Sequence, residues 1–454
     1  MIDIPGVIAN NENAKEACDF YHKFRSDIAR LAFYNVKHFR ISLSWPRLLP
    51  NGKSTEPNPI GVRFYNDMID AMLHHGITPY ITLHHWDLPT ALVDKNSSEP
   101  AWLGKEIIDQ FNDYADFCFK TFGDRIKYWI TFNEPFCMSW LAYGVGKFAP
   151  RRCSAWRDGY PKGQSCKDIG GGGDTAKEPY IVGKTILLAH AKAYRTYHAK
   201  YAATQKGKIG ITLNCDFGLP YDKDKPEDVE AAETHVHFML GWFANPIENG
   251  DWPEVMIRQA GERLPPFTPE EKAQIKGTSD FFGINHYSTS YFRPIGVGGG
   301  DWESDRRVAS SFADKSGVMI GPIAESFWLA VYGPGLRGLL NFIKKNYGDE
   351  KGIYIFENGV SVPNENNLKL ADALKDTFRI NYFRQYLKGV KQAIHEDKIN
   401  IKGYFAWSYL DNFEWNEGYS VRFGMTYVDY RTKKRYPKDS LLWYSQLIKT
   451  KMIS

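Results

Sequence analysis

The chain has 454 residues, 43% of them hydrophobic, and its 57 Lys and Arg against 53 Asp and Glu give a formal net charge of +4. These values are typical of a folded protein and exclude intrinsic disorder, collagen-like repeats and a highly charged tail. The small charge lacks basic runs, and no stretch approaches the ~20 apolar residues of a membrane span. We therefore expect neither nucleic acid nor a membrane as a partner.

Predicted strands and helices alternate along the chain. Short apolar or β-branched runs predict seven strands, which begin at Val36, Ile77, Ile126, Lys208, Phe281, Ile353 and Ile401. Apolar residues at helical spacing predict helices between them, for example over 14–35 and 178–203. Strands separated by helices require a parallel sheet with right-handed crossovers. No linker or internal repeat divides the chain, so we expect one domain over residues 1–454.

Two long inserts, at 149–177 and 296–324, are rich in Gly and polar residues. They follow the third and fifth predicted strands, so in a parallel barrel they would lie as loops at the carboxyl-end face, where such barrels build their sites. An eight-stranded barrel would need one more strand before the first helix. Residues 1–13 are short, polar and turn-like instead.

The six cysteines divide into two groups. Four fall in predicted helices or strands and are expected to be buried thiols: Cys18, Cys118, Cys137 and Cys215. Cys153 and Cys166 bracket one polar loop, and a bridge between them, the alternative to two free thiols, would imply an oxidising compartment. The glycosylation sequon at Asn96 weakly supports the same location, although residues 1–5 lack the pattern of a signal peptide.

Polar, charged or aromatic residues stand at or just after the ends of the predicted strands: Arg40, His85, Trp86, Asn133, Glu134, Asn285, Tyr287, Glu357 and Trp407. Because barrel strands converge, these side chains would face one another in one crater. Glu134 and Glu357 each end a strongly apolar strand, where an unpaired ionised group would be costly. Two carboxylates flanking one bond are the usual equipment of glycoside hydrolysis, and the alternative is a structural salt bridge for each.

Other residues around these positions fit a sugar site. Aromatic faces for the C–H side of a sugar ring, or for the protein core, are offered by Trp86, Trp328, Trp407 and Trp415. Polar groups crowd the loop after the last strand: Asp411, Asn412, Glu414 and Asn416. The His84-His85 and His235-Val236-His237 segments lack the companions and spacing of a zinc site. We expect no metal, no cofactor and no Gly-x-Ser-x-Gly nucleophile.

The two carboxylate segments make the sequence recognisable. Thr131-Phe132-Asn133-Glu134-Pro135 and Ile355-Phe356-Glu357-Asn358-Gly359 resemble the carboxylate motifs of glycoside hydrolase family 1, the β-glucosidase family. Further segments that match the family lie at 39–47, 82–89, 241–247, 283–287 and 406–415, and the similarity runs from about residue 5 to about residue 448.

This resemblance implies a (β/α)8 TIM barrel and a retaining exo-β-glycosidase that acts through a covalent glycosyl-enzyme. The substrates would be small β-D-glucosides, with β-galactosides and β-fucosides as a possible extension. Glu134 would be the acid/base and Glu357 the nucleophile. The non-reducing sugar would be held by His85, Asn133, Trp407, Glu414 and Trp415, and Trp86 would also bind the substrate. Trp328 would flank the aglycone, and Arg40, Asn285 and Tyr287 would surround the nucleophile.

The sequence departs from the family at its front. The resemblance leads us to expect that the family's first strand, whose Gln binds the sugar, is absent from this sequence, because the first residues are similar to the loop that follows that strand. We therefore expect an open edge beside the Val36 and Ile401 strands, as in a truncated chain, or else another segment that closes the gap. The alternative function is a non-catalytic sugar- or partner-binding relative, inactivated by that loss. The 153–166 loop resembles that of secreted members and suggests a secreted or lysosomal/vacuolar protein, and the sequence leaves the oligomeric state open.

Overall fold

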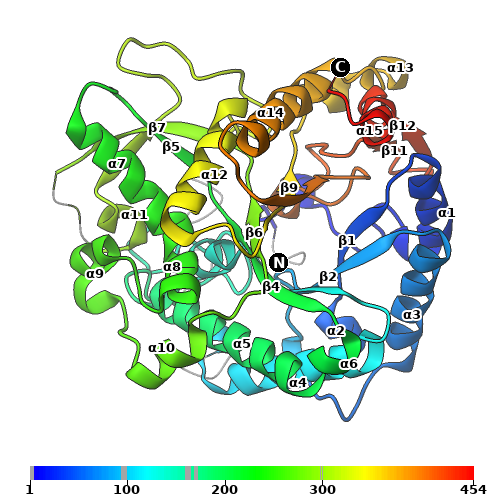
Figure 1. Cartoon of the computed structure of the whole chain (residues 1–454), viewed down its shortest axis with the longest axis horizontal. Helices are drawn as coiled ribbons and strands as arrows, with labels where there is room; N and C mark the ends of the chain where they lie inside the picture. Colours follow the sequence, from blue (N-terminus) through cyan, green and yellow to red (C-terminus); the bar gives the residue numbers. More distant parts are fainter. Residues whose placement is uncertain are drawn as a thin grey trace.

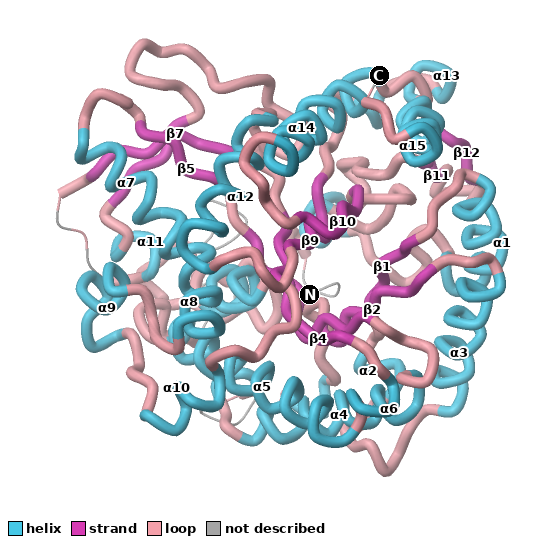
Figure 2. The backbone as a smooth tube through the Cα atoms, viewed as in Figure 1, coloured by secondary structure: helices cyan, strands magenta, loops and turns pink. Residues whose placement is uncertain are grey.

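Seven parallel strands curve into a nearly closed barrel inside a layer of helices (Figure 1; Figure 2). The computed structural model describes residues 5–93, 100–158, 165–167, 172–296, 298 and 300–453, so the sequon at Asn96 lies outside the described residues. The barrel strands, in spatial order, are β1 (His38–Ser42), β2 (Thr78–His84), β3 (Tyr128–Asn133), β4 (Lys208–Asn214), β6 (Phe282–Asn285), β9 (Ile353–Asn358) and β10 (Ile401–Ala406). Each begins within two residues of its expected start, which confirms the (β/α)8 class.

The helices cover the barrel because each presents an apolar stripe to the strands. In α4 (Glu106–Phe122), for example, Ile107, Phe111, Tyr114 and Cys118 recur at helical spacing and are buried. The longer helices are α1 (Phe20–Phe33), α3 (Pro59–His74), α5 (Glu178–Lys200), α7 (Pro226–Val236), α8 (Trp242–Asn249), α12 (Gly333–Tyr347), α14 (Thr377–His395) and α15 (Asp439–Thr450). The shorter ones are α2 (Trp45–Leu48), α6 (Ala202–Gln205), α9 (Glu254–Ala260), α10 (Pro269–Ile275), α11 (Trp302–Asp305) and α13 (Leu370–Ala373).

The expected opening lies between β1 and β10, the two ends of the strand order. Within the described residues these strands are not paired with each other, and both are more exposed than the fully buried β9. The segment around Val7 and Ile8 is buried but forms no strand. Its backbone contacts the loop after β10 instead, where the Asn416 side-chain amide donates to the Val7 carbonyl over 2.8 Å.

Two expectations about local structure were wrong. The first helix begins at Phe20 and not at residue 14, because Ala17 and Asp19 adopt left-handed backbone conformations that interrupt a helix. The insert at 296–324, expected as a loop, contains α11 and the strand β8 (Val308–Ser311). That strand joins β5 (Phe217–Pro220) and β7 (Thr289–Pro294) in a small second sheet, and β11 (Thr426–Val428) pairs with β12 (Arg435–Pro437) in a hairpin.

The cysteines lie as expected. Cys153 and Cys166 form a disulfide that closes the loop between them. The other four are free and buried: Cys18, Cys118, Cys137 and Cys215.

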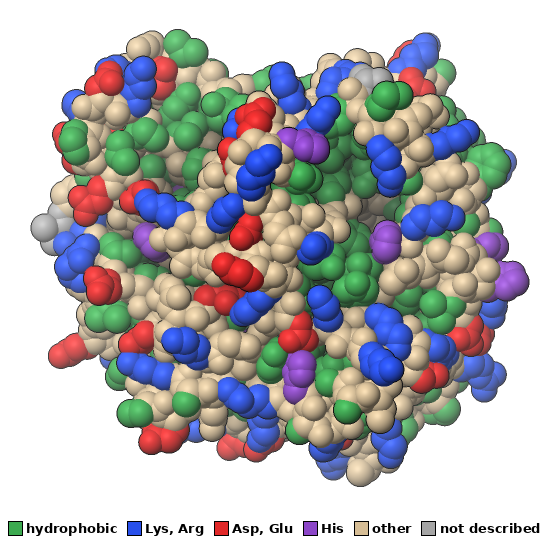
Figure 3. Space-filling model, in the orientation of Figure 1, with side chains coloured by type: hydrophobic (Ala, Val, Ile, Leu, Met, Phe, Trp, Pro, Cys, Tyr) green, Lys and Arg blue, Asp and Glu red, His purple; other side chains and the backbone are tan. Residues whose placement is uncertain are grey.

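Figure 3 shows positive and negative side chains interspersed over the face that it draws. Across the described parts of the chain, every helix is too short or too polar to cross a membrane.

Candidate active site

A cavity of about 310 Å³ opens at the carboxyl ends of the barrel strands. Six strands each deliver a lining residue from their last positions or the residue just beyond: His85, Asn133, Asn214, Asn285, Glu357 and Trp407. The predicted site residues Trp86, Glu134, Tyr287, Trp328, Glu414 and Trp415 also line it. Arg40 does not line the cavity but contacts Glu357 from β1. The fold thus brings together the strand-end residues and tryptophans that the sequence singled out for the site, whereas Asp411 and Asn412 are not part of the cavity lining.

Glu357 belongs to β9 and is only 4% exposed. The Arg40 guanidinium donates to its Oε1 over 2.5 Å, and the Tyr287 hydroxyl donates to its Oε2 over 2.6 Å. Burial and the charge of Glu357 raise the pKa of Tyr287 well above its usual value, so the phenol keeps its proton and remains a donor. A cation and a fixed donor on opposite oxygens stabilise Glu357 as a carboxylate.

Glu134 follows β3 directly and is 7% exposed. Its backbone φ of 47° lies in the left-handed region, which costs a non-glycine residue about 1–2 kcal/mol. The Asn285 amide donates to Oε1 over 2.8 Å, and the Cys137 thiol donates to Oε2 over 3.1 Å. Burial, followed by the negative charge of Glu357, raises the pKa of Glu134 to about 7. Near neutral pH this carboxyl therefore holds a proton in a large fraction of molecules.

Asn133, the last residue of β3, links the surroundings of the two carboxyl groups. Its Oδ1 accepts from Arg40 over 2.6 Å and from the Asn285 amide over 3.1 Å. Its Nδ2 lies 3.1 Å from Nε2 of His85. Because an amide Nδ2 can only donate, this His85 nitrogen accepts and the ring is neutral. Burial, then the Arg40 charge, holds the pKa of His85 well below its usual value, in agreement with that assignment.

Aromatic rings form one wall of the cavity. The rings of Trp86 and Trp415 lie 4.5 Å apart between centroids, and His85 lies 6.2 Å from Trp407. The Trp86 indole donates to the Asn133 carbonyl over 2.9 Å, which fixes the orientation of its ring. Trp328 approaches Tyr287 edge-on at 5.8 Å. Such a wall offers flat apolar faces beside the polar groups at the strand ends.

Glu414 adds a third carboxyl to the cavity lining. Burial, then the negative charge of neighbouring Glu417, raises its pKa to about 8. Near neutral pH its side chain is therefore mainly a neutral acid, which can both donate and accept a hydrogen bond.

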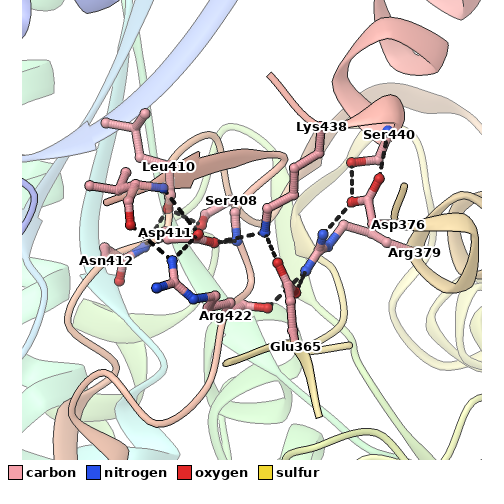
Figure 4. Close-up of polar contacts among 12 residues, drawn as sticks. Glu365, Asp376, Arg379, Ser408, Leu410, Asp411, Asn412, Arg422, Lys438 and Ser440 are labelled. Carbon is pink, nitrogen blue, oxygen red and sulfur yellow. Dashed lines mark hydrogen bonds and ion pairs between the residues drawn. The ribbon is translucent and has the colours of Figure 1, made fainter. Parts of the chain in front are cut away.

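A buried ion network holds the loop that carries Trp407, Glu414 and Trp415 (Figure 4). It consists of Glu365, Asp376, Arg379, Asp411, Arg422 and Lys438. Lys438 lies between Glu365 and Asp411, with 3.0 Å to the latter, and Asp411 also accepts from Arg422 over 2.5 Å. Three acids meet three bases, so the formal charge of the network cancels.

This network corrects the expectation for Asp411. The sequence placed it among the polar residues that would crowd the site, but it is fully buried and faces Lys438 and Arg422 rather than the cavity. An ionised carboxylate beneath the loop is satisfied by two cations there. Asn412 is likewise not part of the cavity lining, whereas Asn416 is.

Several lining residues were not anticipated. Asn214 ends β4 and Asp216 follows two residues later, so the strand-end criterion could have found both. Burial raises the pKa of Asp216 to about 7. Cys137 was expected only as a buried thiol, and its spacing of three residues from Glu134 was the available clue. Within the described residues no group of three or more His, Cys, Asp or Glu could hold a metal ion.

The ion network should be sensitive to loss of its central cation. Lys438→Met leaves Asp411 and Glu365 buried with less compensation, so we expect the free energy of unfolding to fall by about 3–5 kcal/mol. Urea denaturation followed by tryptophan fluorescence measures this change. The matched control is Lys449→Met, an exposed lysine of helix α15, which begins directly after Lys438. Equal effects of the two substitutions would contradict the role assigned to the network.

Comparison with known proteins places this site in a family. The family model described as glycosyl hydrolase family 1 matches residues 1–453. A curated relative, Beta-glucosidase 1B of Phanerodontia chrysosporium, is 45% identical over 98% of this chain and 78% of that protein. Two solved structures match almost the whole chain. One is a rice beta-glucosidase mutant in a covalent complex with Glc, with a TM-score of 0.93, 41% identity, and coverage of 99% of this chain and 92% of that chain.

The other is a beta-glucosidase from the fungus Humicola insolens in complex with glucose, with a TM-score of 0.92 and 43% identity, covering 99% of this chain and 91% of that chain. The family match, the identities and the shared barrel agree with one another. The chain belongs to glycosyl hydrolase family 1.

Proposed function

We propose that the protein is a retaining β-glucosidase that hydrolyses β-D-glucosides by double displacement. The observation that carries the proposal is the pair of buried carboxyl groups in one cavity, which have opposite surroundings. Arg40 faces Glu357, whereas burial and a neighbouring anion favour a proton on Glu134. Two carboxyls, one ionised and one protonated, are what the retaining mechanism needs. Membership of the family and the named relatives support the same conclusion.

In the first step, Glu357 attacks the anomeric carbon of the bound glucoside. The bond to the aglycone breaks, its electron pair stays on the glycosidic oxygen, and Glu134 gives that oxygen its proton. Arg40 and Tyr287 hold the Glu357 carboxylate in place while one of its oxygens forms the new ester bond. The product is a covalent glucosyl-enzyme and a free alcohol.

In the second step, Glu134 is a carboxylate and takes a proton from water. The oxygen of that water attacks the anomeric carbon, the ester bond to Glu357 breaks, and β-glucose leaves. Two inversions at one carbon give net retention. This route requires the carboxyl groups about 5–5.5 Å apart, too close for a water to act directly between them.

The sugar-binding residues follow from the same proposal. The amides and the neutral imidazole beside the carboxyls, together with the neutral acid of Glu414, would bind hydroxyl groups of the non-reducing glucose. The aromatic wall would pack against the C–H face of the ring. This assigns His85, Trp86, Asn133, Trp407, Glu414 and Trp415 to the glucose, and Trp328 with Phe327 to the aglycone.

We also propose that the chain forms one catalytic domain and works in an oxidising compartment, as a secreted or lysosomal/vacuolar protein. One continuous hydrophobic cluster, from Cys18 in the N-terminal part to Leu441 in α15, supports the first proposal. The Cys153–Cys166 disulfide supports the second, because thiols in a reducing compartment rarely stay paired.

Substitution of the two carboxyls tests the proposed mechanism. Glu357→Gln removes the nucleophile, so kcat for an aryl β-glucoside should fall at least about 10³-fold. Glu134→Ala should lose activity mainly on poor leaving groups, and azide should partly restore turnover of activated substrates, whose departure needs no acid. A 2-fluoro-glucoside probe followed by peptide mass spectrometry should label Glu357.

The control is Glu262→Gln, an exposed carboxylate on the surface, which should keep wild-type activity. Label on any residue other than Glu357 would refute the assignment of the nucleophile. A wild-type protein that binds glucose-like inhibitors but turns over no β-glucoside would instead favour a non-catalytic sugar-binding role.

The pH dependence of activity should report the proton on Glu134. The first step needs the acid form, so kcat/KM should be maximal below the pKa of Glu134 and fall as pH rises through about 7. This fall in kcat/KM, the basic limb of the pH profile, reports the coupled pair of carboxyl groups. Glu357→Gln removes a neighbouring negative charge and should therefore favour ionisation of Glu134. Initial rates between pH 4 and pH 9 measure the limb, and a rate that stays level to pH 9 would contradict it.

The disulfide can be tested on protein from its natural source. If the compartment is oxidising, alkylation without prior reduction should leave Cys153 and Cys166 unmodified, and peptide mass spectrometry should find them linked. Cys118, a free buried thiol, should be alkylated once the protein is unfolded and serves as the internal control. Alkylation of all three cysteines would contradict the proposed location.

A further inference from the structure

Both oxygens of the Glu134 carboxyl group have a neighbour within the protein, and the two neighbours differ in chemistry. Oε1 faces the Asn285 amide at 2.8 Å, and Oε2 faces the Cys137 thiol at 3.1 Å. An acid that gives a proton to a substrate must carry it on one of these oxygens. The surroundings decide which oxygen that is.

The orientation of Asn285 follows from a chain of contacts that begins at a cation. Arg40 can only donate, so the atom of Asn133 that it touches is the carbonyl oxygen Oδ1. The Asn285 atom that faces this oxygen at 3.1 Å must therefore be the donor Nδ2. The same Nδ2 faces Oε1 of Glu134. An amide nitrogen cannot accept, and it donates more strongly to an unprotonated carboxyl oxygen than to a hydroxyl oxygen, so this contact favours Oε1 as the oxygen without the proton.

Cys137 places no such restriction on Oε2. A thiol is a weak donor and its sulfur a weak acceptor, so it can face either form of the acid. The side-chain amide of Asn214 approaches the same sulfur at 3.8 Å, which leaves the S–H free to point towards Glu134. The contact is fixed locally, because the Cys137 backbone N–H donates to the Glu134 carbonyl over 2.9 Å at the start of the segment Cys137–Ala142.

We propose that Oε2 is the oxygen of Glu134 that carries the transferred proton, and that Cys137 is the residue that positions it. This inference rests on the proposed glucosidase function. When the Oε2–H bond breaks and the proton passes to the glycosidic oxygen, the Cys137 S–H donates to the carboxylate left behind. In the second step Oε2 takes the proton of the attacking water.

The thiol keeps its own proton throughout this cycle. Burial, then the charge of Glu134, raises the pKa of Cys137 well above its usual value, so a thiolate does not form beside the carboxylate. Cys137 is therefore neither a nucleophile nor a proton carrier. Its contribution is one hydrogen bond, which favours the ionised form of Glu134 over the protonated form.

Replacement of the thiol tests this contribution through the pH profile. Cys137→Val has a similar shape but no donor, so ionised Glu134 loses its partner and the basic limb of kcat/KM should move up by about 0.5 pH unit. Its kcat should fall several-fold, because the second step needs the carboxylate. Cys137→Ser and Cys137→Thr restore a donor that is stronger than a thiol, and their limbs should lie at or below that of the wild type.

The matched control is Cys118→Val in helix α4, a buried thiol that does not line the cavity. It reports the cost of the same side-chain change to stability and should leave the limb unmoved. If Cys137→Val fails to fold, the limbs of the Ser and Thr variants against wild type still give the expected order.

Two results separate this inference from the function on which it rests. Limbs that coincide within about 0.1 unit for the wild type and all three Cys137 variants would overturn the role of Cys137 while leaving the glucosidase function intact. A wild type that does not turn over β-glucosides would overturn the function itself. Limbs in the order Val above Cys above Ser or Thr would support the inference.

Discussion

The guanidinium of Arg40 is the contact on which the order of the cavity depends. One of its nitrogens donates to Glu357 and another to Asn133, and both partners are buried. A cation with fixed donors leaves each acceptor only one arrangement. The position of the nucleophile, the orientation of Asn133 and, through it, that of Asn285 all follow from this one side chain.

The same cation explains how two carboxyl groups in one small cavity have different states. The negative charge of Glu357 is compensated by its contact with Arg40. Glu134 instead lies near the negative charge of Glu357 and accepts hydrogen bonds from two neutral donors. The difference arises from where the guanidinium donates: its hydrogen bonds go to Glu357 in β9 and to Asn133 at the end of β3, whereas the carboxyl group of Glu134 accepts from Asn285 and Cys137. A symmetrical distribution of donors would not separate an acid from a nucleophile.

Much of the fold and site could be predicted, because the features that define them are local. A polar residue at the end of an apolar strand is visible in sequence, and converging strands bring such residues together. Asp411 was misplaced because a local feature does not show distant partners: Lys438, the residue just before α15, compensates the charge of Asp411 only in the folded chain. Cys137 was overlooked because a weak donor is no sequence motif. The left-handed backbone conformations at Ala17 and Asp19 are likewise not visible in the apolar spacing from which the helix was predicted.

Strand β1, which bears Arg40, is an end strand of the barrel sheet. Among the described residues it is hydrogen-bonded to β2 alone, whereas β9 has a neighbour on each side. The positive charge that orders the cavity is thus carried by an edge strand, which is hydrogen-bonded along one side only. Local unfolding of this strand on warming would separate the guanidinium from its partners while the other barrel strands remain paired. Activity would therefore be lost at a lower temperature than that of global unfolding.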